Sequence, residues 1–297
     1  MLHVRLSRRD PEGHKGHFGQ VGVVGGCAHV SSLMIGAPAL AALGALRAGC
    51  GLVRIASPMP IANECLTLVP SAMAIPLACD GTGSLIPHES VASVDALSQW
   101  ASALVIGPGM GRSEGVTAIS LRGIQQDHCP VIVDADALNA LAEVPDLARE
   151  VRGKVIFTPH PGEFARLAKG LGIAPITHDS ASRQSGAEAL AQRLGIIVVL
   201  KGAGTVVTDG QNTWTCGHSV PTLAIPGSGD VLAGVIAGLI AQHRGPRTSL
   251  LDLVCIAVEA HAVAGETWAQ CHHASGGMLA SELAGLIPRT LEELREE

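Results

Sequence analysis

Short runs of β-branched and aliphatic residues alternate along this chain with longer alanine-rich stretches whose apolar positions recur at helical spacing. The run Ile196–Leu200 is apolar at every position, which is typical of a parallel strand buried on both faces. Strands that alternate with helices in this way predict a mostly parallel sheet with helices on both sides.

The predicted elements follow one another without a break. We predict strands over Gln20–Val24, Leu52–Ala56, Ala72–Ile75, Ala103–Ile106, Val131–Asp134, Val155–Thr158, Ile196–Leu200 and Thr205–Thr208. We predict helices around 37–48, 87–99, 114–126, 136–142, 161–169 and 180–194, and then at 230–243, 249–268 and 276–286. No proline-rich linker, low-complexity block or internal repeat divides the pattern. We therefore expect residues 1–297 to form a single domain, an α/β fold arranged as a three-layer α/β/α sandwich.

Composition narrows the class of function. The chain is 47% hydrophobic and contains 36 glycines, which fits a compact α/β protein with tight turns. Aromatic residues make up only 2%, so the core must consist of alanine, valine, leucine and isoleucine. The net charge of −6 argues against a nucleic-acid partner. The expected ligands are therefore small molecules.

Two apolar stretches are similar to membrane spans in length but not in composition. Residues 30–53 contain Pro38 and Arg47, and residues 219–241 contain Asp230, so neither is an unbroken apolar run. The N-terminal residues lack the apolar segment of a signal peptide. We expect a cytoplasmic protein without a membrane partner.

Metal-ligating residues do not gather in the sequence. The eight cysteines are scattered without a Cys-x-x-Cys pair, which is typical of buried thiols in a reducing compartment. Cys271, His272 and His273, with His261 ten residues earlier, form the only candidate cluster. Adjacent histidines on a helix point to different faces, and zinc needs four convergent ligands. We assign no metal ligands from the sequence.

The segment Gly227–Asp230 carries the clearest chemical signal. A glycine-rich turn enters an apolar helical pattern there, so its backbone N–H groups lie at a helix N-terminus, where they can bind an anion. We predict an anion hole formed by Gly227, Ser228 and Gly229. Asp230 adds a carboxylate beside it, which suggests a base that activates a hydroxyl next to a phosphate. The alternative is that Asp230 only caps the helix.

Two further unusual segments follow predicted strands, and ligands of parallel sheets bind at the carboxyl ends of the strands. Gly107–Gly111 contains three glycines that permit close approach of the backbone to a ligand, although it could equally be a tight turn. In Asp134–Asn139 we expect Asp134 to lie near the site and Asp136 to be mostly structural.

Two more segments complete the predicted site. In Thr158–Glu163, two prolines hold His160 in a defined direction, and Glu163 lies near the start of a helix. In Lys201–Thr205, the lysine can meet nucleotide phosphates and the flexible backbone can line an adenine or ribose. The spacing is neither that of a P-loop nor that of a dinucleotide fingerprint.

The order and spacing of these segments resemble the ribokinase-like superfamily and, within it, the ADP/ATP-dependent NAD(P)H-hydrate dehydratases. The resemblance extends over nearly the whole chain. Its blocks are His14–Gly16 with Val21–Gly26, Gly36–Leu40, Arg47–Val53, Gly107–Gly111, Val133–Asn139, Thr158–Glu163, Lys201–Thr205 and Gly227–Gly234.

The resemblance implies an enzyme that returns NADHX and NADPHX, the hydrated forms of the reduced cofactors, to NADH and NADPH. ADP or ATP would be consumed as co-substrate, and Mg²⁺ is expected because phosphoryl transfer generally needs a cation. Stand-alone bacterial members are similar to this chain in lacking the fused epimerase domain, and they typically use ADP. Members are often tetramers, so the resemblance also implies a homo-oligomer.

Roles carry over to individual positions. The resemblance implies that Ala37, Gly109 and His160 contact the hydrated dinucleotide and that Asp230 faces its hydroxyl as the catalytic residue. The nucleotide would be held by Lys201, Gly202, Ala203, Gly204, Thr205 and Gly229.

The chain departs from the family pattern just before the anion hole. Members commonly read close to Asn-Pro-Gly-Met-Ala-Thr-Gly-Gly there, whereas residues 220–227 read Val-Pro-Thr-Leu-Ala-Ile-Pro-Gly. Pro226 offers no N–H to an anion. Two other functions are therefore open: a kinase of the same fold that acts on a heterocyclic alcohol, and a nucleotide-binding protein without catalysis. Retention of Asp230 counts against the second, because a carboxylate beside a phosphate does not favour mere binding.

Overall fold

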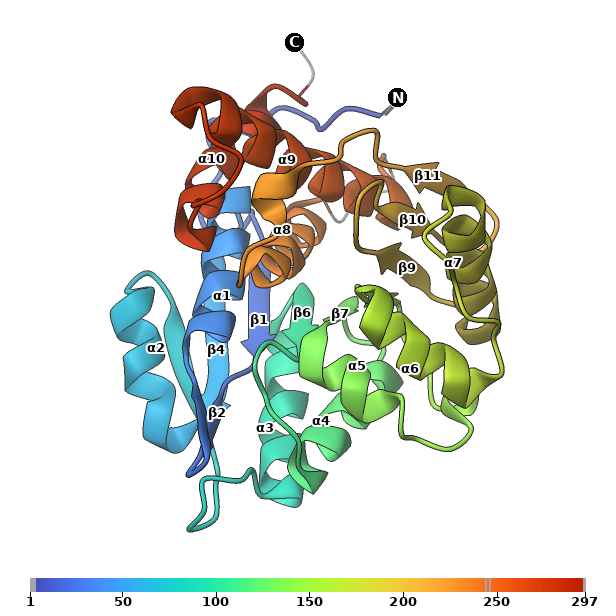
Figure 1. The fold of residues 1–297 in the computed structure, drawn as a ribbon. Coiled ribbons are helices and arrows are strands. Elements are labelled where there is room, and N and C mark those ends of the chain that lie inside the picture. Colours follow the sequence, from blue (N-terminus) through green and yellow to red (C-terminus); the bar gives the residue numbers. More distant parts are fainter. Residues whose placement is uncertain (1–3, 244, 246, 296–297) are drawn as a thin grey trace.

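A single sheet organises the structure, a computed structural model that describes residues 4–243, 245 and 247–295. Within these residues, nine strands lie in the order β11-β10-β9-β8-β7-β6-β1-β4-β5 (Figure 1). Neighbours from β5 to β9 are parallel, and β10 and β11 are antiparallel additions at one edge. The strands are β1 (Gln20–Val24), β4 (Leu52–Pro58), β5 (Met73–Leu77), β6 (Ala103–Ile106), β7 (Val131–Val133), β8 (Val155–Phe157), β9 (Ile197–Leu200), β10 (Val206–Thr208) and β11 (Thr213–Thr215).

Helices cover both faces of the sheet. One layer contains α1 (Gly36–Ala48), α8 (Ser228–Gln242), α9 (Leu250–His272) and α10 (Ala280–Glu292). The other contains α3 (Pro87–Trp100), α4 (Glu114–Gln125), α5 (Ala135–Leu141), α6 (Pro161–Leu171) and α7 (Ser180–Leu194). The predicted α/β/α sandwich is confirmed.

Strand residues alternate between the two layers, which explains why the central strands are apolar at every position. In β6, Ala103 and Val105 belong to the core beneath α1 and α8, whereas Leu104 and Ile106 belong to the core beneath α3 and α4. All four are fully buried. The sheet is thereby fixed on both faces, and its carboxyl edge is a rigid platform.

Helices α1 and α8 touch backbone to backbone. A methyl group added at Gly234 would overlap the carbonyl oxygen of Ala41, and one at Gly44 would overlap that of Val231. The two helices run in the same direction, because Gly227, just before α8, lies against Leu40 in the first half of α1. The two helices therefore begin at the same end of the molecule.

Some elements were not predicted. They are a hairpin of β2 (Cys27–His29) and β3 (Ser32–Met34), the helix α2 (Ala62–Leu68), the edge strand β11 and three short 3₁₀ turns, η1 (Met59–Ile61), η2 (Leu147–Arg149) and η3 (Pro221–Leu223). These segments are too short for a hydrophobic period to distinguish them from loops. The last predicted helix, 276–286, occurs later in the chain as α10. Across the described ranges, no helix is both long and apolar enough to cross a membrane.

Candidate active site

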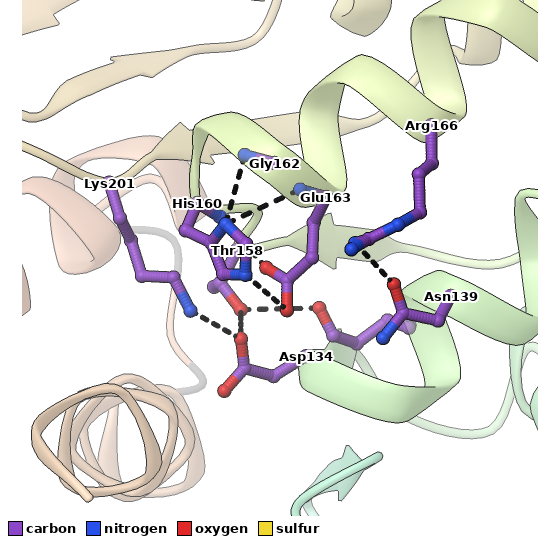
Figure 2. A network of polar contacts seen from close by, with 9 residues as sticks. Asp134, Asn139, Thr158, His160, Gly162, Glu163, Arg166 and Lys201 are labelled. Carbon is purple, nitrogen blue, oxygen red and sulfur yellow. Dashed lines mark hydrogen bonds and ion pairs between the residues drawn. The ribbon is translucent and has the colours of Figure 1, made fainter. Parts of the chain in front are cut away.

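Asp134 lies where three parallel strands end. It follows β7, while Thr158 follows β8 and Lys201 follows β9, so the sheet brings all three to one edge. Its Oδ1 accepts hydrogen bonds from the Thr158 hydroxyl and the Lys201 ammonium, both at 2.7 Å (Figure 2). Asp134 is 1% exposed, so Lys201 rather than water compensates its charge. The prediction that Asp134 belongs to this edge agrees with the structure.

The N-terminus of α8 faces this ion pair. A Cβ atom at Gly229 would lie 3.2 Å from Lys201 Nζ and 3.8 Å from Asp134 Oδ2. Gly227 precedes the helix with φ +87°, a left-handed conformation that favours glycine. The helix begins at Ser228, which makes Asp230 its third residue and not its cap. The capping alternative for Asp230 is therefore wrong.

One predicted donor of the anion hole is engaged within the protein. The Ser228 N–H donates to the Ile225 carbonyl oxygen at 3.4 Å, so of the three amides predicted to form the anion hole, this one already has a carbonyl partner. Within the described part of the chain, the Gly227, Gly229 and Asp230 N–H groups have no protein acceptor. These three amides, at the positive end of the helix dipole, are available to an anion.

The pKa of the Asp230 carboxyl suits a general base that works near neutral pH. Burial is the largest cause of its raised pKa, about 7, and the nearby Asp134 raises it further, while Lys201 opposes the shift. A carboxyl with this pKa accepts a proton readily at neutral pH.

Glu163 is a further buried carboxyl, whose burial the sequence did not reveal. It is 5% exposed, and burial raises its pKa to about 7 against the opposing charge of Lys201. Its Oε2 accepts a hydrogen bond from the His160 N–H at 2.8 Å, and His160 Nδ1 accepts those from the Gly162 and Glu163 N–H groups (Figure 2). This reciprocal cap fixes the start of α6 and leaves the half-exposed His160 ring at the mouth of the site. Burial lowers the His160 pKa, so its ring favours the neutral form.

A cavity of about 600 Å³ opens beside these groups, a volume typical of small-molecule sites. Its polar lining includes His160, Lys201, Thr205 and Gly229. Its apolar lining includes Val220, Leu223, Leu232, Val258 and Ala262. The cavity thus offers cationic and amide groups for phosphates and an apolar region for a flat base.

An arginine that the sequence analysis missed supports the Lys201–Thr205 turn. Arg183, on α7, donates to the carbonyl oxygens of Ala203 at 2.5 Å, Leu200 at 3.1 Å and Lys201 at 3.3 Å. Gly202 and Gly204 in this turn have φ of +144° and +63°. No spacing rule connects Arg183 with a segment almost twenty residues later, so only the fold reveals this contact.

Ala37 and Gly109 form a separate pair outside the cavity lining. A Cβ atom at Gly109 would lie 3.0 Å from the Ala37 Cβ. The loop that carries Gly109 is tied to the carboxyl edge because the Gly111 N–H donates to Asp136 Oδ2 at 2.8 Å. Asp136 is thus structural, as expected, and all five predicted segments lie along one edge of the sheet.

The histidine-rich segment near residue 271 does not bring its side chains together as the sequence cluster suggested. In the described chain, no group of three histidine, cysteine, aspartate or glutamate residues is placed to hold a metal ion. His272 stacks on Trp268, with ring centroids 4.2 Å apart. His261 is buried elsewhere: its Nε2 lies 3.0 Å from the Ser228 carbonyl oxygen, and burial lowers its pKa to about 4.

The fold is that of the ribokinase-like proteins, as predicted: solved structures of such proteins match over most of the chain. The model of the NAD(P)H-hydrate dehydratase family matches residues 21–289, and the chain belongs to this family. It is similar to the crystallised ADP/ATP-dependent NAD(P)H-hydrate dehydratase of Bacillus subtilis, with 29% identity and a TM-score of 0.76 over 98% of this chain and 95% of that one.

Curated relatives of the chain belong to the same family. The ADP-dependent (S)-NAD(P)H-hydrate dehydratase of Xanthomonas campestris is 34% identical over 96% of this chain and 92% of its own length. The bifunctional NAD(P)H-hydrate repair enzyme of Thermanaerovibrio acidaminovorans is 40% identical over 96% of this chain and 52% of its own length. The chain thus spans about half the length of several bifunctional relatives that it matches.

Proposed function

We propose that this protein is an ADP- or ATP-dependent dehydratase that returns NADHX and NADPHX to NADH and NADPH. The observation that carries the proposal is the placement of Asp230, a carboxyl of pKa about 7 in the first turn of α8, next to free amides and Lys201. A base beside an anion site at the edge of a nucleotide-sized cavity suits phosphoryl transfer to a hydroxyl.

The proposed reaction has two steps. Asp230 accepts the proton of the ring hydroxyl while that oxygen takes the terminal phosphoryl group, so ADP becomes AMP or ATP becomes ADP. The ring nitrogen lone pair then expels phosphate as the carbon–oxygen bond breaks, which leaves an iminium ion. Loss of a proton from the neighbouring ring carbon to the released phosphate forms the ring double bond and restores the dihydronicotinamide. Phosphorylation thereby turns a poor leaving group into a good one.

Each ligand has a proposed place. The adenine nucleotide occupies the 600 Å³ cavity, with its base against Val220, Leu223 and Ala262 and its phosphates between Lys201 and Gly229. The turn of Lys201, Gly202, Ala203, Gly204 and Thr205 borders the nucleotide, and Ala37, Gly109 and His160 contact the hydrated dinucleotide.

The carboxyl edge also suits a magnesium ion. Asp134, Glu163 and Asp230 place three carboxyl groups around one ammonium, Lys201, so the site carries an excess of negative charge. Magnesium is usually held by one or two carboxylates together with substrate phosphates. Asp134 and Glu163 would contribute these carboxylates, and the ion would neutralise charge on the phosphates.

The test measures recovery of NADH absorbance and release of phosphate from NADHX, Mg²⁺ and either ADP or ATP. Asp230→Asn should reduce turnover by about 10²–10⁴-fold and still bind nucleotide. Asp146→Asn is the matched control, because Asp146 lies outside the site in a left-handed conformation that asparagine adopts easily. Full turnover by Asp230→Asn contradicts the proposal. A phosphorylated product without phosphate release would instead identify a kinase.

A further inference from the structure

A histidine at the rim of the nucleotide cavity is held by a carboxylate at each ring nitrogen. His218 Nδ1 lies 2.8 Å from Glu266 Oε1, and Nε2 lies 3.2 Å from Glu259 Oε1. A neutral imidazole has only one N–H, so it would face one of the two carboxylates with a lone pair. Only the imidazolium donates to both.

This contact joins two walls of the cavity. His218 belongs to the segment 216–226, which connects β11 to α8 and contributes much of the cavity lining, and both glutamates belong to α9. The segment has two further polar contacts with α9: the Thr222 hydroxyl donates to the Gly265 carbonyl oxygen at 3.0 Å, and the Cys216 thiol donates to Glu259 Oε2 at 3.8 Å. Val220 and Leu223 pack against Gly265 beside it. His218 supplies the charged part of this attachment.

We propose that His218 is a positioning residue for the nucleotide: its imidazolium, held between Glu259 and Glu266, keeps the 216–226 wall in place and so sets nucleotide affinity. The inference rests on the proposed nucleotide site but not on the chemical step. It predicts an affinity that is high when His218 is protonated and falls when the proton is lost.

The direction of the pH effect follows from the surrounding charges. Burial lowers the His218 pKa, but the two glutamates together outweigh it, and the net pKa lies above the ordinary 6.5. The Cys216 thiol, 3.8 Å from Glu259 Oε2, has its pKa raised by burial to about 11 and stays neutral. His261, also on α9, is neutral as well, because burial lowers its pKa to about 4. The affinity for the nucleotide should therefore decrease as the pH rises past the pKa of His218.

Asp230 and Glu163 titrate near pH 7, so the test compares variants at each pH. Calorimetry measures the Kd for ADP from about pH 6 to about pH 9, a range that spans the ordinary histidine value. We expect His218→Gln to bind ADP about tenfold more weakly than wild type at low pH, since one charge-assisted contact is worth about that factor. Its Kd should approach the wild-type value at high pH, and kcat should change little.

Glu266→Gln is the matched control. Its amide can donate to Nδ1 while Nε2–H donates to Glu259, so a neutral His218 satisfies both contacts. This variant should keep its ADP affinity at high pH, where wild type loses it. The inference is overturned if His218→Gln binds as tightly as wild type at every pH, or if Glu266→Gln keeps the wild-type pH profile. Absence of ADP binding to wild type would instead contradict the proposed function.

Discussion

The Lys201 ammonium lies 2.7 Å from Asp134 Oδ1 and joins the ends of β9 and β7 across the end of β8. Because Asp134 is buried, removing the cation leaves a carboxylate without compensation. We expect Lys201→Met to lower the free energy of unfolding by about 3–5 kcal/mol, measured by urea denaturation.

The control for this pair is the double variant Asp134→Asn, Lys201→Met. It removes both charges, so part of the lost stability should return, and a double-mutant cycle gives the coupling energy. Losses that simply add would show that the two side chains do not depend on each other.

Asp230 should make the protein less stable as the pH rises. Its pKa is about 7 in the folded chain against an ordinary 3.8, so the folded state holds the proton more tightly. The associated stability is present below pH 3.8 and is lost as the pH passes 7. At pH 8, the free energy of unfolding of Asp230→Asn should exceed that of wild type by roughly 4 kcal/mol. Urea unfolding at several pH values checks this; a difference that does not change with pH would contradict it.

His261 should have the opposite effect. Burial lowers its pKa from 6.5 to about 4, so its contribution is complete above 6.5 and is lost as the pH falls towards 4. His261→Gln can still donate to the Ser228 carbonyl oxygen but does not titrate. Thermal melts should show wild type losing about 3 kcal/mol relative to this variant as the solution is acidified. Parallel curves for the two proteins would argue against the buried, neutral histidine.

The contact between α1 and α8 can be tested with two alanine substitutions. Gly234→Ala should cost about 1–3 kcal/mol or more, because its methyl group meets the Ala41 carbonyl oxygen. Gly285→Ala, on α10 with no atom within 4 Å of the added methyl, should instead gain about 0.5–1 kcal/mol. Chemical denaturation of both variants decides; equal effects would mean that α1 and α8 are not in close contact.

The sheet and its functional edge could be predicted because each central strand is an apolar run followed by an unusual polar or glycine-rich segment. The strand order then places Asp134, Thr158 and Lys201 together. The roles of Ala37, Gly109 and His160 toward a dinucleotide stay predictions, as do the magnesium ion and the oligomer. For His160, the structure adds a second role as the cap of α6.

Other parts of the site had no signal in the sequence. Arg183 and His218 act through partners 17–48 residues away, and such distances follow only from the folded path of the chain. The burial of Glu163 depends on α6 packing against the edge of the sheet, whereas its position in the sequence indicated a helix start. The engaged Ser228 amide depends on the bend at Ile225, which no local pattern specifies.

The close contact of α1 and α8 has a consequence for how the site can move. Ala37 lies in the first turn of one helix and Asp230 in the first turn of the other, so the two positions belong to one rigid unit. Any rearrangement on ligand binding must then come from the facing side of the cavity. Structures with and without nucleotide should superimpose over these helices and differ in the segment 216–226.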